Sequence, residues 1–245
     1  MTLSTFTING DTILPITLYG GNRHPEVLDW HRRVMVGHFG IPVNYVEAPF
    51  PSCSHGSVMN EVLRQTVDTP EAPTFYWWLD MDCISLRREA VGLAYQQARD
   101  RMTVWGHLWR SNHKVGPDGT MAHPYASQAC LLFARELYNA LDRPDMDHWV
   151  PRSDTAEELT YAAKAAGYGV SLLYPSYSVV ADTPGDNGVF YGMGNTYGPL
   201  SRPLWCHVSS APHPRHVEVF IETAKMVMAD AFEGPTPAKP YAYSA

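Results

Sequence analysis

The chain has 245 residues, of which 45% are hydrophobic and 18% are charged, as in an ordinary folded globular protein. Its formal net charge of −7 argues against a broad surface for nucleic acid or for an anionic membrane. The length suits one domain, with or without embellishments.

The cysteines and the amino terminus indicate a compartment. The four cysteines, Cys53, Cys83, Cys130 and Cys206, are far apart and form no CxxC pair. This pattern predicts reduced thiols in a reducing environment. The first eleven residues have no charged segment followed by an apolar one, and no apolar run reaches the length of a membrane span. We therefore expect a cytoplasmic protein without a membrane segment.

The first third of the chain predicts a βαβ unit with a parallel sheet. Apolar runs at 13–19 and 43–47 predict strands, and the periodic segment 25–39 between them predicts a helix that ends at Gly40. A second helix is expected at 58–67, before a strand that ends at Asp80.

The later segments continue this alternation of helices and strands. Helices are predicted at 88–101, 134–141, 155–166 and 217–232, and strands at 102–109, 128–133 and 170–174. Polar or glycine-rich segments at 112–123, 142–153 and 181–203 predict loops. The pattern as a whole predicts a single α/β domain whose central sheet is mostly parallel and mixed at its edge, with flanking helices.

The most informative stretch is the apolar run 75–79, which leads directly into Asp80 and Asp82. Such a run predicts a buried strand of a parallel sheet, where ligands gather at the carboxyl ends of the strands. Two carboxylates there repel each other unless a cation or a donor-rich ligand lies between them. Hard oxygen ligands suit Mg²⁺ or Mn²⁺. The alternative is a strand that ends in a solvated turn.

In their order along the chain, these segments resemble a GT-A nucleotide-sugar glycosyltransferase of the family-2-like type. The resemblance covers about residues 13–207 and implies a Rossmann-like domain over 1–233 with a disordered tail at 234–245. It divides the domain into a nucleotide-binding half at about 13–110 and an acceptor half at about 111–233. It also implies a nucleoside diphosphate sugar, such as a UDP sugar, as the donor and Mn²⁺ or Mg²⁺ as the cation.

The resemblance implies roles for residues in the nucleotide-binding half. The end of the first strand would hold the nucleobase, and the segment 55–60 would lie close to the nucleotide; the residues are Tyr19, Gly20, Gly21, Asn22, His55 and Asn60. Asp80 would face the ribose or a metal-bound water, and Asp82 would ligate the cation. A histidine late in the chain is a frequent third ligand, and His207 offers one; an ordinary buried hydrogen bond explains His207 equally well.

The acceptor half matches more loosely. Segment 127–136 is similar to a strand and helix that contact the acceptor, and segment 154–168 is similar to an acidic helix that ends in Ala-Gly-Tyr. In an inverting enzyme a carboxylate must accept the acceptor's proton, so Asp154 and Glu158 are the candidate bases. Asp154 is offset by one residue from the family's pattern. It equally fits a helix N-cap, with Glu157 completing a capping box.

Two aromatic features have both a functional and a structural interpretation. Trp105, His107 and Trp109 alternate along a predicted strand, so they would share a face that stacks on a sugar or packs in the core. Segment 182–202 carries five glycines and two tyrosines, and it would form either a lid over the donor or a static connection.

Two other protein classes fit parts of the chain. Haloacid-dehalogenase-like phosphatases use a strand ending in D-x-D, and Asp80 would then be a nucleophile. In that class the motif normally follows the first strand, whereas two predicted strands precede it here. A non-catalytic protein that binds nucleotide sugars is the third hypothesis. The acceptor would be a small molecule, a glycan or a protein; a modified base in phage DNA would need a local basic groove.

Overall fold

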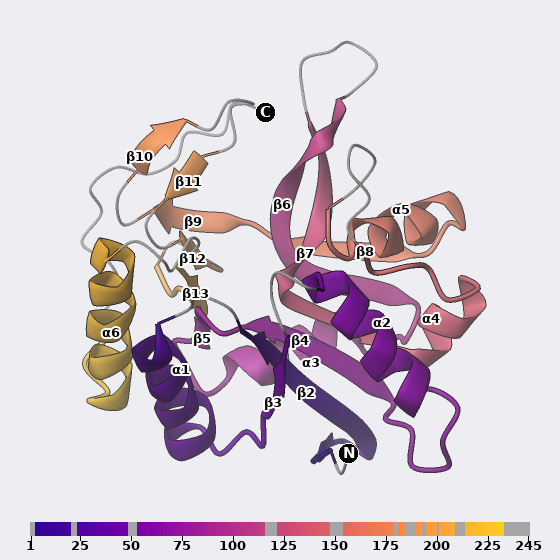
Figure 1. Cartoon of the computed structure of the whole chain (residues 1–245), viewed down its shortest axis with the longest axis horizontal. Coiled ribbons are helices and arrows are strands. Elements are labelled where there is room, and N and C mark those ends of the chain that lie inside the picture. The colour runs from indigo at the N-terminus through magenta and orange to yellow at the C-terminus, as the bar shows by residue number, and fades with distance from the viewer. Residues whose placement is uncertain are drawn as a thin grey trace. The chain divides into compact units, whose positions relative to one another are not determined.

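The computed structural model describes residues 3–20, 24–48, 53–115, 122–147, 154–178, 181–184, 190–192, 195–199, 201–208 and 214–232. Contacts between residues divide the chain into two compact units, and Figure 1 labels the helices and strands from which they are built. The first unit comprises Met1–Gly21, Pro42–Asp80 and Gly92–Leu172, and the second comprises Asn22–Ile41, Met81–Val91 and Leu173–Ala245. Among the described residues, no helix combines the length and apolar character needed to cross a membrane.

The first unit is built on a seven-stranded mixed sheet with the order β1-β2-β4-β7-β6-β8, and β3 pairs with β2 beside this path. Strand β2 runs parallel to β3 and β4, whereas β1–β2, β4–β7 and β6–β7 are antiparallel pairs. The strands are β1 (Phe6–Ile8), β2 (Asp11–Tyr19), β3 (Asn44–Glu47), β4 (Phe75–Asp80), β6 (Thr103–Val115), β7 (Ala122–Ala134) and β8 (Gly169–Leu173).

Helices cover both faces of this sheet, which explains the unbroken apolar run in β4. Helices α2 (His55–Thr66), α4 (Arg135–Ala140) and α5 (Glu157–Ala165) supply residues to a core that contains Tyr76 and Trp78 of β4. Alternate side chains of a strand point to opposite faces. On the other face, Phe75 makes an edge contact with Tyr95 of α3 (Ala90–Ala98), with ring centroids 5.6 Å apart. Every apolar residue of β4 is therefore buried.

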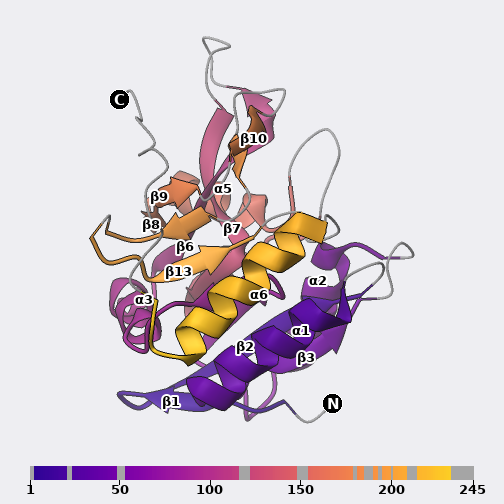
Figure 2. The ribbon, with the colours of Figure 1, turned by 90° about the vertical axis from the view of Figure 1, so that its left-hand side faces the viewer.

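The second unit contains two small antiparallel sheets and a pair of helices. One sheet has the order β5-β13-β12-β9, from β5 (Cys83–Ser85), β13 (Trp205–His207), β12 (Asn195–Tyr197) and β9 (Pro175–Ser178). The other sheet pairs β10 (Ala181–Pro184) with β11 (Phe190–Gly192). Helix α1 (Pro25–Arg32) continues as a π-helix (Arg33–His38) and lies beside α6 (Pro214–Met228), as Figure 2 shows. Arg33 and Lys225 both approach the ring of Trp30 there.

The predicted α/β class and the mixed central sheet with flanking helices are confirmed. The predicted loops are partly wrong. Segment 181–203 contains β10, β11 and β12, and segment 112–123 includes the ends of the long β6–β7 hairpin. The sequence also gave no signal for β1, β5, β9 or β13. A strand of three or four residues is too short to show an alternating pattern, and pairing with its neighbours decides its conformation.

Substitution of Gly56 should destabilise the first unit by overpacking. A Cβ added at Gly56 would lie 2.2 Å from the carbonyl oxygen of Met146 and 2.3 Å from the Cα of Asp147. We expect Gly56→Ala to lower the free energy of unfolding by about 1–3 kcal/mol, because the backbone of Met146 and Asp147 must move to make room for the added Cβ. Gly92 of α3 is the control, since a Cβ there meets nothing within 4 Å. Gly92→Ala should raise stability by up to about 1 kcal/mol. Equal denaturation midpoints for the two variants would contradict this account.

Candidate functional site

The carboxyl ends of the parallel strands carry the predicted nucleotide residues of the first unit. Leu18 of β2 is in register with Asp80 of β4, and Tyr19 is in register with Glu47 of β3. Asp80 is half-buried at the end of its strand. Tyr19 and Asp80 therefore share one edge of the sheet, as expected from the parallel pairing. Gly21 and Asn22 lie outside the described residues.

Gly20 follows β2 where the backbone passes close to the end of β3. The Ala48 amide donates to the Tyr19 carbonyl at 2.6 Å, and a Cβ on Gly20 would lie 1.8 Å from the Ala48 carbonyl oxygen. Only glycine permits this approach without displacing the backbone. The glycine therefore has a structural role, whether or not a nucleobase lies against it.

The second unit brings Asp82 and His207 together. Strands β5 and β13 pair with Cys83 opposite His207, and the Val208 amide donates to the Asp82 carbonyl at 2.9 Å. The His207 Nε2 atom lies 3.3 Å from the Asp82 Oδ1 atom. Both residues are only 2% exposed. An ionised carboxylate removed from water in this way is stable only when a cation or hydrogen-bond donors compensate its charge.

Asp80 precedes this pair by two residues. It ends the Pro42–Asp80 segment of the first unit, and Met81 alone separates it from Asp82. Two carboxylates and an imidazole are a donor set that binds a divalent cation. Asp80, Asp82 and His207 are the predicted metal ligands, and the second unit brings Asp82 and His207 together.

His31 of α1 is a further polar residue near this pair that we did not predict from the sequence. Its side chain is fully buried, and burial lowers its pKa to about 4, against the opposing effects of a hydrogen bond with the Cys83 backbone and the charge of Asp82. The signal was available, because His31 falls four residues after Val27 on the apolar face of the predicted helix. A histidine on such a face needs a polar partner in the core.

Asn60 and His55 lie on α2 in the first unit. The Asn60 side chain donates to Asp145 at 2.5 Å and accepts from the Met146 amide at 3.0 Å. Ser54 caps the helix by accepting from the Ser57 amide at 3.0 Å, and both serine hydroxyls donate to Asp147. His55 is half-buried at the first position of the helix. The Asn60 amide thus fastens the 145–147 segment to α2, a structural role that the sequence did not reveal.

The two candidate bases lie at the start of α5. The Asp154 carboxylate accepts from the Thr155 amide at 2.8 Å and from the Tyr125 hydroxyl at 3.0 Å. It is not the predicted N-cap, because Ala156 holds that position with a φ of 60°. One half of the capping box is present, since Glu157 accepts from the Asp154 amide at 2.7 Å. Glu158 is half-buried in the first turn of the helix.

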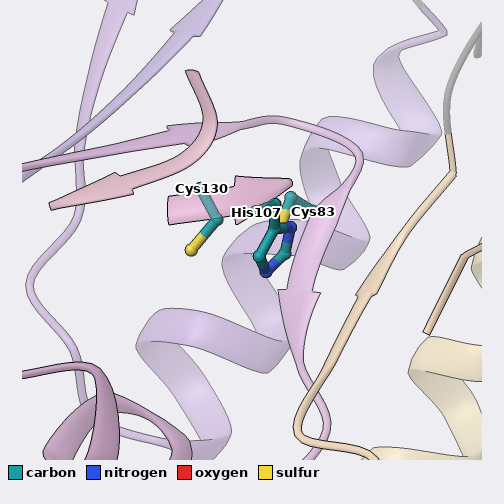
Figure 3. A group of neighbouring side chains, drawn as sticks. All are labelled: Cys83, His107 and Cys130. Atoms are coloured by element: carbon teal, nitrogen blue, oxygen red, sulfur yellow. The ribbon is translucent and has the colours of Figure 1, made fainter. Parts of the chain in front are cut away.

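The aromatic face of β6 belongs to the core of the first unit. Trp105 and His107 are buried, their rings make an edge contact at 6.1 Å, and the Trp105 indole donates to Gln97 at 2.6 Å. Figure 3 shows His107 and the buried thiol of Cys130 on neighbouring strands, and it also labels Cys83 of the second unit. The core interpretation is therefore confirmed for Trp105 and His107.

The glycine-rich segment 182–202, predicted as a lid or a static connection, lies partly outside the described residues. Residues 185–189, 193–194 and 200 lie outside the described part of the chain. The parts that are described include β11 and β12, and β12 pairs with both β9 and β13. His207 is the last residue of β13, and the pairing of β13 with β12 joins it to this segment.

Comparisons with known proteins give no match for this chain: no protein-family model fits the sequence, and no curated protein is significantly similar to it. The geometry therefore carries the functional argument.

The buried His31 should make the metal-free protein less stable in acid. Its pKa is about 4 in the folded protein and 6.5 when exposed, so the unfolded chain binds the proton more readily between these values. Stability from this residue is complete above pH 6.5 and falls as the pH drops to 4, by about 3 kcal/mol. Urea titrations of the wild type and His31→Gln, in the presence of a chelator, measure this. The variant should lose less stability over this range, and equal losses would contradict the assignment.

Proposed function

We propose that this protein is a metal-dependent glycosyltransferase, which moves a sugar from a nucleoside diphosphate donor to an acceptor hydroxyl. The observation that carries the proposal is the buried contact between Asp82 and His207. Asp82 follows Asp80 by two residues, and Asp80 ends strand β4 of the α/β sheet. The ordered resemblance of the sequence to family-2-like GT-A enzymes supports the same activity.

The donor set determines which residues would hold the cation. Asp82 and His207 would ligate it, and Asp80 would bind it directly or through a water. When bound, the cation would stabilise the negative charge that develops on the departing diphosphate. Tyr19 and Gly20, at the carboxyl edge of β2, would lie against the nucleobase. The half-buried carboxylate of Asp80 would also accept hydrogen bonds from the ribose.

The acceptor step needs a base if the anomeric carbon is inverted. The acceptor oxygen would attack the anomeric carbon while its proton passes to a carboxylate, and the bond to the diphosphate would break with its electron pair on the leaving oxygen. Asp154 and Glu158 at the start of α5 are the candidate carboxylates. They belong to the first unit, together with the β7 segment that resembles the acceptor-binding region.

Nucleotide binding should depend on a divalent cation. We expect calorimetric titration with UDP or GDP to give a dissociation constant at least about tenfold lower with Mn²⁺ than with a chelator, because Asp82 and His207 would hold a cation that offsets the charge of the diphosphate. Equal affinities under the two conditions would remove the basis of the proposal. Hydrolysis of phosphomonoesters in place of sugar nucleotides would favour the phosphatase, and metal-dependent binding without turnover would favour a non-catalytic protein.

Replacement of Asp82 should abolish the cation dependence. Asp82→Ala removes the central carboxylate and should leave UDP affinity the same with and without Mn²⁺. Asp80→Asn keeps a ligand oxygen and should weaken nucleotide binding less. The matched control in the second unit is Asp29→Ala, because Asp29 is 54% exposed and pairs with Arg33 on the helix surface. An Asp82→Ala protein with the wild-type dependence on Mn²⁺ would exclude this motif from metal binding.

The imidazole ligand should also set the choice of metal. Imidazole nitrogen suits Mn²⁺ better than Mg²⁺, which prefers oxygen ligands. We therefore expect UDP to bind more tightly with Mn²⁺ than with Mg²⁺, and His207→Asn to reduce that difference by about tenfold, as ligand-shell changes commonly do. Calorimetry of both proteins with both metals measures this. If the preference were the same in the variant, His207 would not be a ligand.

A further inference from the structure

A buried carboxylate at the start of α5 takes no part in the mechanism described above. Glu157 is fully buried, and both of its carboxylate oxygens accept hydrogen bonds. The Oε2 atom accepts from the backbone amide of Asp154 at 2.7 Å, and the Oε1 atom accepts from the hydroxyl of Tyr161. The carboxylate therefore connects one turn of α5 to the residue that precedes the helix.

Burial of the Glu157 carboxylate lowers the stability of the fold. Removing a carboxylate from water is unfavourable, and neutral donors such as an amide and a phenol compensate that cost only in part. Burial raises the pKa of Tyr161, and the hydrogen bond to Glu157 raises it further, so the phenol stays neutral and donates its proton. An apolar residue would complete the core of the helix at a lower cost. This cost indicates a role for Glu157 in addition to packing.

Asp154 is the residue that these contacts fix. Its amide donates to Glu157, and its carbonyl accepts from the Glu157 amide at 3.1 Å. Its carboxylate accepts from the Thr155 amide through Oδ1 and from the Tyr125 hydroxyl through Oδ2. Ala156 has a left-handed backbone conformation, so the chain turns at this residue before α5 begins at Glu157. The backbone and the carboxylate of Asp154 are thus both held by hydrogen bonds, which fixes the orientation of the carboxylate.

We propose that Glu157 is a positioning residue that holds Asp154 as the base for the acceptor hydroxyl, with Tyr125 fixing the orientation of the Asp154 carboxylate. The inference rests on the proposed function and assigns the base to Asp154 in place of Glu158. The acceptor proton passes to the Asp154 carboxylate as the acceptor oxygen bonds to the anomeric carbon and the diphosphate leaves with its electron pair. Glu157 touches neither substrate and acts through the Asp154 backbone.

Two substitutions at Glu157 separate positioning from packing. Glu157→Met has a similar length and removes both acceptor oxygens. Glu157→Gln keeps an oxygen for the Asp154 amide and can turn its amino group toward the oxygen of Tyr161. Thr66→Val is the control in the first unit. It removes the hydrogen bonds of Thr66 with the Tyr76 hydroxyl and the Val62 carbonyl, on α2 and not on α5.

The kinetic assay measures the release of UDP or GDP in the presence of Mn²⁺. Its substrate is UDP-glucose, UDP-N-acetylglucosamine or GDP-mannose, whichever of the three the wild type hydrolyses fastest. Water replaces the acceptor and needs the same base. We expect Glu157→Met to lower kcat by at least about tenfold and Glu157→Gln by less than about threefold, within the range for general-base catalysis. The affinity for the nucleotide with Mn²⁺ should stay within about twofold of the wild type in both variants, since only the base is displaced. Thr66→Val should leave kcat unchanged.

Amide hydrogen exchange at Asp154 tests the contact itself, without any need for turnover. The exchange should be at least about tenfold faster in Glu157→Met than in the wild type, and close to the wild-type rate in Glu157→Gln. Unchanged exchange in Glu157→Met would overturn the proposal. So would an unchanged kcat, or a loss of kcat matched by an equal loss of nucleotide affinity. Failure of the wild type to bind any nucleotide with Mn²⁺ is a different result, and it would overturn the proposed function.

Discussion

The candidate metal site depends on one interaction, the contact between a buried carboxylate and a buried imidazole. Asp82 and His207 approach to 3.3 Å and are almost fully removed from water. A buried charge of this kind is costly unless a partner compensates it, so such sites are retained where a charged ligand uses them. The imidazole is the polar neighbour of this carboxylate, and a divalent cation between them would offset the buried negative charge. The surrounding structure places these two side chains.

Two different kinds of β-structure carry the candidate residues. In the first unit, parallel pairing of β2 with β3 and β4 collects the ends of three strands at one edge of a sheet. In the second unit, three-residue strands place His207 opposite Cys83, next to Asp82. The chain passes from the first arrangement to the second through Met81. The D-x-D sequence therefore spans the point at which the chain leaves the first unit and enters the second.

The sequence predicted the long elements better than the short ones. The strand 75–80 was predicted correctly because five consecutive apolar residues fit a strand buried on both faces. Strands β5 and β13 are three residues each, and only their pairing identifies them. Asp82 and His207 are 125 positions apart, a separation that no local pattern bridges; the family resemblance suggested this pair. His31 was missed although it falls on the apolar face of the predicted helix; its partner, the backbone of Cys83, lies on another element.

Several residues have local roles that a sequence motif does not reveal. Asn60 fits the nucleotide segment of the resembling family, yet its amide binds Asp145 and the Met146 backbone. Asp154 fits a helix cap, yet Ala156 takes that position. In both cases the decisive partner is brought by folding from elsewhere, or by an unusual backbone conformation. Side-chain identity predicted the kind of chemistry at these positions, and the structure determined which partner each side chain has.

The most direct test of the central claim is the position of a bound metal ion. Crystals grown with Mn²⁺ and UDP, measured at a wavelength where manganese scatters anomalously, would locate the ion. The account predicts one anomalous peak within about 2.5 Å of both the Asp82 carboxylate and the His207 imidazole, in contact with the diphosphate. A bound nucleotide with no peak at these two side chains, or a manganese ion held by other residues, would contradict it.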